Sequence, residues 1–149
     1  MQLKGDLFLS KKVVYVYLRF VRQTSMPGAR SREGFFVAAY ELSRNTNLDD
    51  TTYNHVTELL VWFGGNLAAP KKFSRTTSKG HYRRMDTPGL SWFKPSAQLH
   101  VIKAFELKAL LDEHGHAIEV LKARRPGYVV FEDRHQIVAE PFADDHWFA

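Results

Sequence analysis

The chain has 149 residues, 44% of them hydrophobic and 25% charged, so we expect one domain, residues 1–149, with a core of its own rather than a disordered chain. It contains no cysteine, which excludes a disulfide framework, a thiolate zinc site and a cysteine nucleophile. The net charge of +5 is uneven: residues 1–100 carry 15 Lys or Arg against 7 Asp or Glu, and residues 101–149 carry 6 against 9.

The first third of the chain predicts a strand, a loop and a helix. β-Branched and aromatic residues dominate Lys11–Arg22 on both faces of the alternation, which is typical of a central strand covered on both sides. Gln23–Arg32 contains a Met-Pro-Gly turn signal and is expected to be a loop. Residues 33–44 predict a helix, with Phe35 and Phe36 near its apolar face.

A second helix is predicted in the middle of the chain. Asp49 or Asp50 is suited to cap its N-terminus, because a carboxylate there can accept hydrogen bonds from free backbone N–H groups. Apolar residues recur at helical spacing from Tyr53 to Phe63. Gly64-Gly65 is expected to end the helix, since glycine is common just beyond a helix C-terminus.

A long loop, a short segment and a third helix follow. Residues 68–89 lack apolar periodicity and exceed the usual loop length, which is typical of a functional loop. Leu90–Phe93 is expected to be a short strand or a turn. The third helix is predicted to begin near Pro95 and to end at Gly115.

The last third of the chain predicts strands over Ile118–Lys122, Tyr128–Phe131 and Gln136–Glu140, with turns between them. We expect these three strands to form a meander, with Val13–Val21 added beside it. The expected fold class is α/β of the α+β type. It consists of a mainly antiparallel sheet of about four strands with three helices packed on it.

The long loop is also the most basic part of the chain, with six Lys or Arg and no acid over residues 70–84. Fixed positive charge, hydroxyl donors and flat rings are the groups that contact phosphates and stack on bases. The candidate binding residues are Lys71, Lys72, Phe73, Arg75, Lys79, Tyr82, Arg83 and Arg84. A solvated loop or a surface for an acidic protein are the alternatives, and no recognised nucleic-acid motif frames the loop.

The C-terminal hairpin collects acids and a histidine that could bind a hard metal ion. They are Glu132, Asp133, His135 and Glu140. Acids at a hairpin tip are also ordinary turn residues. Several nucleases place acids on a hairpin beside a lysine. Here Glu119 and Lys122 are on the neighbouring strand, but they would lie on opposite faces of it, which does not fit such a site. We therefore predict no metal site and no cofactor.

Three polar residues on separate segments give the chain a resemblance to one branch of the ADP-ribosyltransferases. Arg19 on the first strand, Ser91 in the middle and Glu140 on the last strand follow that family's order of Arg, Ser and Glu. The resemblance implies that Arg19 helps to hold NAD, that Ser91 supports the site and that Glu140 orients the ribose under attack. Two features depart from the family pattern: Trp92 follows the serine where Thr-Ser is usual, and Gln136 stands four residues before the glutamate instead of two.

Two functions remain open after these observations. The preferred one is a small cytosolic, non-catalytic binding or regulatory module whose basic loops engage an anionic partner, either nucleic acid or an acidic protein surface. The alternative is an NAD-dependent ADP-ribosyltransferase-like enzyme. Residues 1–12 do not resemble an export signal, and no stretch approaches the roughly 20 apolar residues of a membrane span, so we expect a cytoplasmic protein with no membrane partner.

Overall fold

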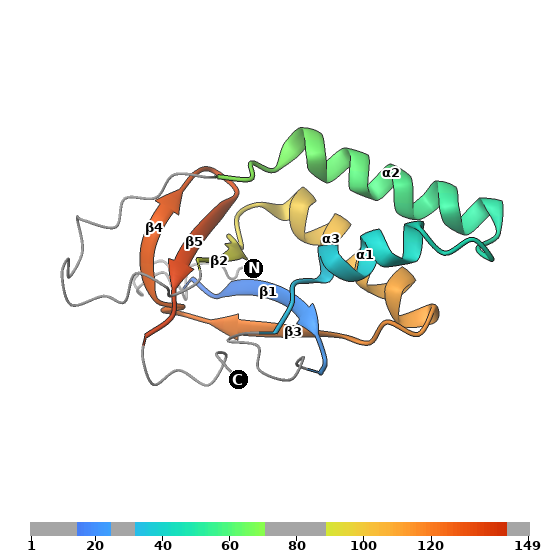
Figure 1. The fold of residues 1–149 in the computed structure, drawn as a ribbon. Helices are drawn as coiled ribbons and strands as arrows, with labels where there is room; N and C mark the ends of the chain where they lie inside the picture. The colour runs from blue at the N-terminus through green and yellow to red at the C-terminus, as the bar shows by residue number, and fades with distance from the viewer. Residues whose placement is uncertain (1–14, 25–31, 71–88, 143–149) are drawn as a thin grey trace, which may run out of the picture.

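The computed structural model describes residues 15–24, 32–70 and 89–142, and within these ranges three helices lie beside a five-stranded antiparallel sheet (Figure 1). The strands are β1 Tyr17–Arg22, β2 Leu90–Phe93, β3 Ile118–Ala123, β4 Tyr128–Glu132 and β5 Gln136–Glu140. The helices are α1 Phe35–Ser43, α2 Asp50–Asn66 and α3 Gln98–Glu113. The α+β class is confirmed, with one strand more than expected. No described helix is both long and apolar enough to cross a bilayer.

The strand order is β3-β1-β2-β5-β4, so the predicted meander is wrong. Strand β3 pairs with β1 along its whole length, from Tyr17↔Ala123 to Arg22↔Ile118, instead of with β4. Strand β1 therefore lies inside the sheet, with β3 on one side and β2 on the other, and it begins at Tyr17. The hairpin of β4 and β5 is the only part of the expected meander that forms among the described strands.

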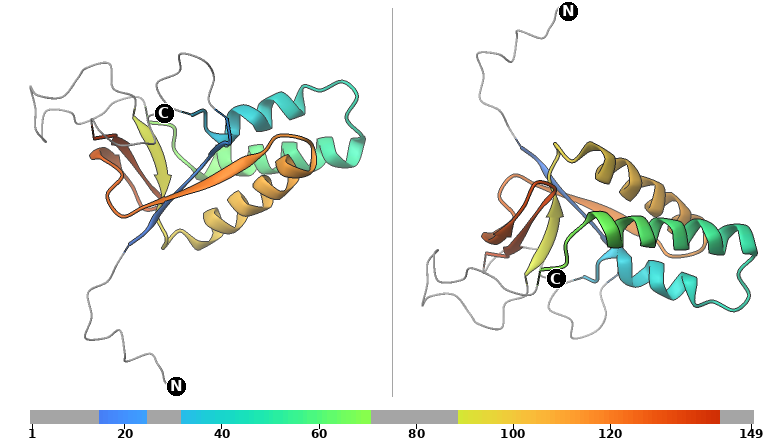
Figure 2. Two further views of the ribbon diagram at one scale, coloured as in Figure 1. Left: turned by 90° about the horizontal axis from the view of Figure 1, so that it is seen from below. Right: turned by 90° about the horizontal axis from the view of Figure 1, so that it is seen from above.

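The sheet divides into two groups of strands at β1. Strand β2 pairs with β1 only at Leu18↔Phe93. Further along β1, Val21 forms an isolated bridge with Gly34 instead. Figure 2 shows β2, β5 and β4 turned away across the direction of β1 and β3. The sheet therefore forks where β2 leaves β1, next to Gly34, which is the N-cap of α1.

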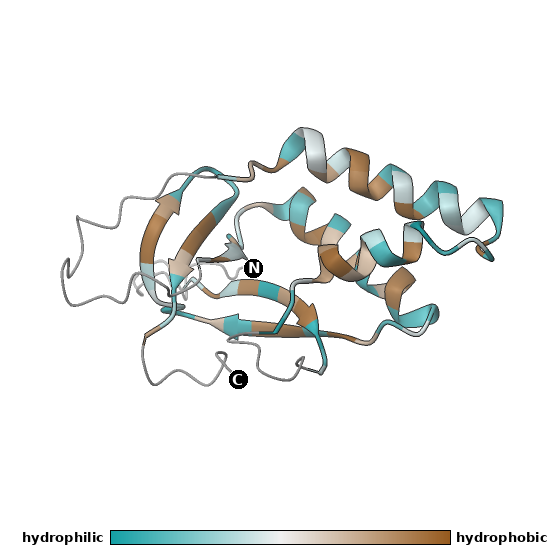
Figure 3. Ribbon diagram, viewed as in Figure 1, coloured by the Kyte–Doolittle hydropathy of each residue, from teal (hydrophilic) through white to brown (hydrophobic). Residues whose placement is uncertain are grey.

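Apolar side chains fill both faces of this bent sheet. On the helical face, the ring of Phe20 stacks on Phe35 with centroids 4.9 Å apart and meets Phe93 edge to face at 5.9 Å. On the opposite face, Trp92 and Ile137 are buried together between the two groups of strands. Apolar positions recur along all three helices (Figure 3), and those that face the sheet complete the larger core.

The helix boundaries follow from local contacts. Asp49 is the N-cap of α2, as predicted, and its carboxylate accepts hydrogen bonds from the backbone N–H and the hydroxyl of Thr52. The expected end at Gly64-Gly65 is wrong, because α2 continues to Asn66. Neither glycine adopts the positive φ of a C-terminal cap, and the Leu67 N–H donates to the Phe63 carbonyl at 2.9 Å.

Candidate functional site

Two of the three residues in the family-like pattern lie against each other at the fork of the sheet. Arg19 lies on β1 and its Nη1 donates to the carbonyl oxygen of Ser91 on β2, at 3.1 Å. The side chain extends toward the start of α1, where a Cβ on Gly34 would lie 3.7 Å from Arg19 Nη2. The guanidinium therefore fills the space that opens where β2 leaves β1.

Arg19 carries an unusually placed charge. Burial, and secondarily the positive charge of Arg32, lowers the pKa of Arg19 to about 10. The group is thus still protonated at neutral pH. Ion pairs of the described residues involve Arg22 and Arg32 but not Arg19. A partly buried guanidinium that no described carboxylate neutralises is a candidate for holding an anionic ligand.

Ser91 continues the chain of hydrogen bonds into the last strand. Its hydroxyl donates to Oε1 of Gln136 at 2.5 Å, and Nε2 of Gln136 donates to the carbonyl oxygen of Ala68 at 2.7 Å. Gln136 is only 1% exposed, so both ends of its amide are hydrogen-bonded within the protein. The chain from Arg19 through Ser91 and Gln136 to Ala68 links β1, β2, β5 and the segment after α2.

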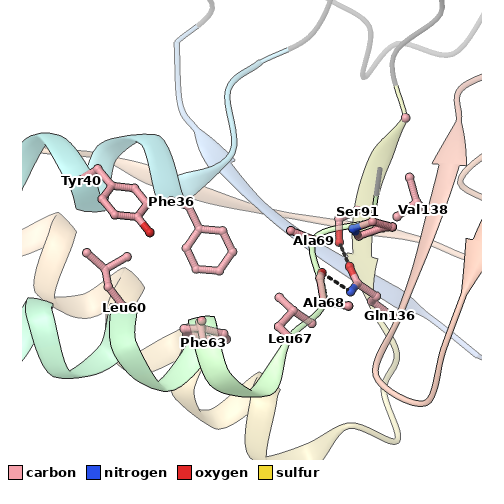
Figure 4. Close-up of a pocket in the computed structure, with 13 residues that line it drawn as sticks. Phe36, Tyr40, Leu60, Phe63, Leu67, Ala68, Ala69, Ser91, Gln136 and Val138 are labelled. Atoms are coloured by element: carbon pink, nitrogen blue, oxygen red, sulfur yellow. Dashed lines mark hydrogen bonds between the residues drawn. The ribbon is translucent and has the colours of Figure 1, made fainter. Parts of the chain in front are cut away.

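An apolar cavity of about 350 Å³ lies between α1, α2 and this hydrogen-bonded chain (Figure 4). The rings of Phe36 and Phe63 line it and meet edge to face with centroids 5.1 Å apart. Ser91 and Gln136 are at the end formed by the strands. No Asp or Glu of the described residues lines the cavity. Its volume and lining are those of a site for a flat, mainly apolar group with few polar atoms.

Glu140, the third residue of the pattern, is not among the described residues that line this cavity. It lies on the same face of β5 as Gln136 and Val138, because residues two apart along a strand share a face. Glu140 is 1% exposed, and its neighbour in register on β4 is Tyr128. Within the pattern, Gln136 rather than Glu140 is the residue in contact with Ser91.

The predicted binding residues from Lys71 to Arg84 lie outside the described part of the chain. The described residues on either side of them, Pro70 and Gly89, both line the cavity. Gln136 is hydrogen-bonded on both sides as well, to Ala68 before the segment and to Ser91 after it. The basic segment therefore leaves and rejoins the described structure beside the cavity.

The acids of the C-terminal hairpin have structural partners. Glu132 pairs with Lys94 at 2.5 Å. One carboxylate oxygen of Asp133 accepts from the backbone N–H groups of His135 and Gln136, at 2.8 and 3.0 Å, which is the ordinary role of Asp in a turn. Within residues 15–24, 32–70 and 89–142, no three His, Asp or Glu side chains are grouped closely enough to hold a metal ion.

Sequence reasoning missed the role of Gln136 and the cavity itself. In the sequence alone, Gln136 stands out only because it lies four residues before Glu140, where the family pattern has two. The available signal was its place as a polar residue beginning the mainly apolar strand β5, where a buried amide requires partners. The cavity depends on how α1 and α2 pack, and no local pattern reports that.

Comparison of the chain with protein-family models, with curated proteins and with solved structures finds no match. Any functional conclusion must therefore come from the geometry and chemistry of the site itself.

Proposed function

We propose that this protein binds a nicotinamide dinucleotide, with the nicotinamide ring in the apolar cavity beside Ser91 and Gln136. The observation that carries the proposal is the hydrogen-bonded chain from Arg19 to Gln136, placed at the end of a cavity with aromatic walls. A flat ring that bears one carboxamide matches this lining. Arg19 is not among the described lining residues, and it contacts the site through its hydrogen bond to the Ser91 carbonyl.

The resemblance to the ADP-ribosyltransferases supports the same ligand through two of the same residues. It implies NAD as the bound molecule and Arg19 and Ser91 as two residues of its site, and these two are in direct contact. The reaction that the resemblance implies is transfer of ADP-ribose from NAD to an acceptor. In that reaction Glu140 would be the group that orients the ribose.

The binding proposal can be tested by filling the cavity without disturbing the core. Gly64 lines the cavity, and a Cβ built on it meets no atom within 4 Å. Gly65 has equal free space but is not among the lining residues, so it provides a matched control. Both glycines lie inside α2, where replacement of glycine by a better helix former stabilises the helix by up to about 1 kcal/mol.

We expect the unmodified protein and Gly65→Leu to bind NAD in isothermal titration calorimetry, and Gly64→Leu to lose binding while remaining folded. Ligand at about 100 times its Kd should also stabilise the two binding proteins by about 2.7 kcal/mol, visible as a rise in Tm. No binding to the unmodified protein, or equal loss in both variants, would reject the proposal.

Transfer is tested separately with labelled NAD. Glu140→Gln keeps the size of the side chain and removes its negative charge. The resemblance predicts that this change abolishes transfer, whereas the burial of Glu140 outside the cavity lining predicts transfer at the unmodified rate. Transfer at the unmodified rate would remove Glu140 from the site. Absence of transfer by the unmodified protein, with NAD bound, would identify a binding protein rather than an enzyme.

A second candidate function is the binding of an anionic macromolecule through the basic segment. The observation that favours it is that six Lys or Arg, against one acid, Asp86, lie between two cavity-lining positions, Pro70 and Gly89. Lys71, Lys72, Arg75, Lys79, Arg83 and Arg84 would supply the charge, and Phe73 and Tyr82 would supply the rings. Binding of nuclease-treated protein to labelled DNA and RNA should then fall steeply as salt rises. Reversal of Lys71, Lys72, Arg83 and Arg84 to Glu should abolish it, and unchanged capture would exclude this segment as the interface.

A further inference from the structure

A second hollow, of about 500 Å³, lies between α1 and α2 next to the apolar cavity. The two hollows share Tyr40 and Leu60 in their lining, so they are neighbours along the groove between the helices. Figure 4 shows these two side chains side by side at the helical end of the cavity. The second hollow, called here the tyrosine groove, is also lined by Tyr53, Thr57 and Arg44.

The sequence of α2 explains why the two hollows are in line. Tyr53, Thr57, Leu60, Gly64 and Leu67 follow spacings of three and four residues, so they share one face of the helix. At 1.5 Å per residue this face extends about 21 Å from the first to the last of them. The buried residues of α2, Val56, Leu59 and Phe63, lie mainly on the adjacent side of the helix, and Leu60 and Leu67 pack against the core at the edge of the groove.

The chemistry changes along the groove. At the end near the sheet the lining is mainly apolar, whereas the tyrosine groove has two half-exposed rings, Tyr40 at 50% and Tyr53 at 47% exposure. Arg44 supplies the positive charge of the tyrosine groove, and Thr57 supplies a hydroxyl. No Asp or Glu of the described residues lines either hollow. An exposed aromatic ring beside a guanidinium suits a nucleobase and its phosphate.

We infer that the tyrosine groove is the subsite for the AMP half of the dinucleotide, with the base against Tyr53 and the diphosphate near Arg44. This inference rests on the proposed function, because the cavity at the other end must hold the nicotinamide. The cavity volume of about 350 Å³ is at the lower end of the range for ligand sites, which leaves most of a dinucleotide to be bound elsewhere. A groove that continues from Leu60 past Tyr53 provides that surface.

The test compares NAD with nicotinamide mononucleotide, which lacks the AMP half. We expect the unmodified protein to bind NAD more tightly than the mononucleotide in calorimetry. Tyr53→Ala and Arg44→Gln should each weaken NAD binding about tenfold, as expected for loss of one stacking or charged contact, and leave mononucleotide binding unchanged. Tyr15→Ala, at an exposed tyrosine outside both hollows, is the control and should change neither affinity.

The possible results separate the two proposals. Equal affinity of the unmodified protein for both ligands, or unchanged NAD binding in both variants, would overturn the subsite while NAD binding itself stands. Equal weakening of both ligands would also overturn it, since the side chains would then act on the nicotinamide end. If neither ligand binds the unmodified protein, the proposed function fails and the subsite fails with it.

Discussion

Gln136 shows how one side chain connects parts of the chain that are far apart in sequence. Its amide accepts from Ser91, 45 residues earlier, and donates to Ala68, 68 residues earlier. An amide buried to this degree stabilises a fold only when its donors and acceptors are satisfied. The side chain therefore holds the end of the cavity and both sides of the basic segment in one arrangement.

Gln136→Leu is expected to lower the free energy of unfolding by about 1–3 kcal/mol, because its two partly buried hydrogen bonds, to the Ser91 hydroxyl and the Ala68 carbonyl, are both lost. Urea denaturation measures the change. Gln98→Leu on the exposed start of α3 is the control and should have little effect. In a double-mutant cycle with Ser91→Ala the two losses should not add, and strict additivity would contradict the hydrogen-bonded chain.

The contact between α3 and the β4–β5 turn consists of two imidazole rings. His100, in the first turn of α3, stacks on His135 with centroids 4.0 Å apart and has its Nε2 2.7 Å from the carbonyl oxygen of Asn66 at the end of α2. Burial and the neighbouring His100 lower the pKa of His135, and the opposing effect of Asp133 is smaller. His100 thus connects the end of α2 to His135.

The sign of the pH effect follows from the lowered pKa of His135. The unfolded chain binds a proton near pH 6.5, and the folded chain binds it only at lower pH, so stability rises with pH across this window. We expect the free energy of unfolding to fall as pH decreases from about 7.5 to about 5.5. His135→Phe, which keeps a ring to stack, should make the profile flatter. Parallel profiles for the two proteins would contradict this role.

The turn between β3 and β4 depends on a close approach of backbone to backbone. A Cβ on Gly127 would lie 2.1 Å from the carbonyl oxygen of Glu140, and its φ of 155° disfavours other residues. The missing side chain lets β4 begin beside the end of β5, where Tyr128 pairs with Glu140. Gly127 therefore fixes the position of β4, the strand that pairs with Glu140.

Gly127→Ala should destabilise the protein more than Gly115→Ala does. Gly115 has a φ of 87°, but a Cβ there meets no atom within 4 Å, so only the backbone cost of about 1–2 kcal/mol applies. At Gly127 the backbone must also move away from Glu140. Urea denaturation of both variants measures the difference. Equal losses would show that the contact with Glu140 relaxes at no cost.

Much of the fold was predictable because its signals are local. The cap at Asp49 and the strands from Ile118 onward could be read from short stretches of sequence, and the structure confirms them. The order of the strands and the continuation of α2 through Gly64 depend on tertiary packing, which no short stretch records. The site divides in the same way: the contact between Arg19 and Ser91 fits the pattern noticed in the sequence, whereas the cavity requires both helices in place.

The two groups of strands, β1 with β3 and β2 with β5 and β4, are joined by a short stretch of pairing between β1 and β2. The helices contact the sheet mainly at β1 and β3, and the group β2–β5–β4 is attached to β1 through one register pair, Leu18↔Phe93. The hydrogen bond from Arg19 on β1 to Ser91 on β2 also joins the two groups. One wall of the cavity belongs to the helices and the other to β2 and β5, so its shape depends on this connection.

Arg19→Met tests that dependence, because it retains a long side chain and removes the donor to the Ser91 carbonyl. We expect the free energy of unfolding to fall by about 1–3 kcal/mol. Amide hydrogen exchange should become faster in β2 and β5 than in β3, since the group beyond the fork loses an attachment. Arg134→Met, on an exposed side chain of the hairpin turn, should leave the exchange pattern unchanged. If Arg19→Met also leaves it unchanged but weakens NAD binding, the guanidinium acts on the ligand and the connection is made by Leu18 and Phe93 alone.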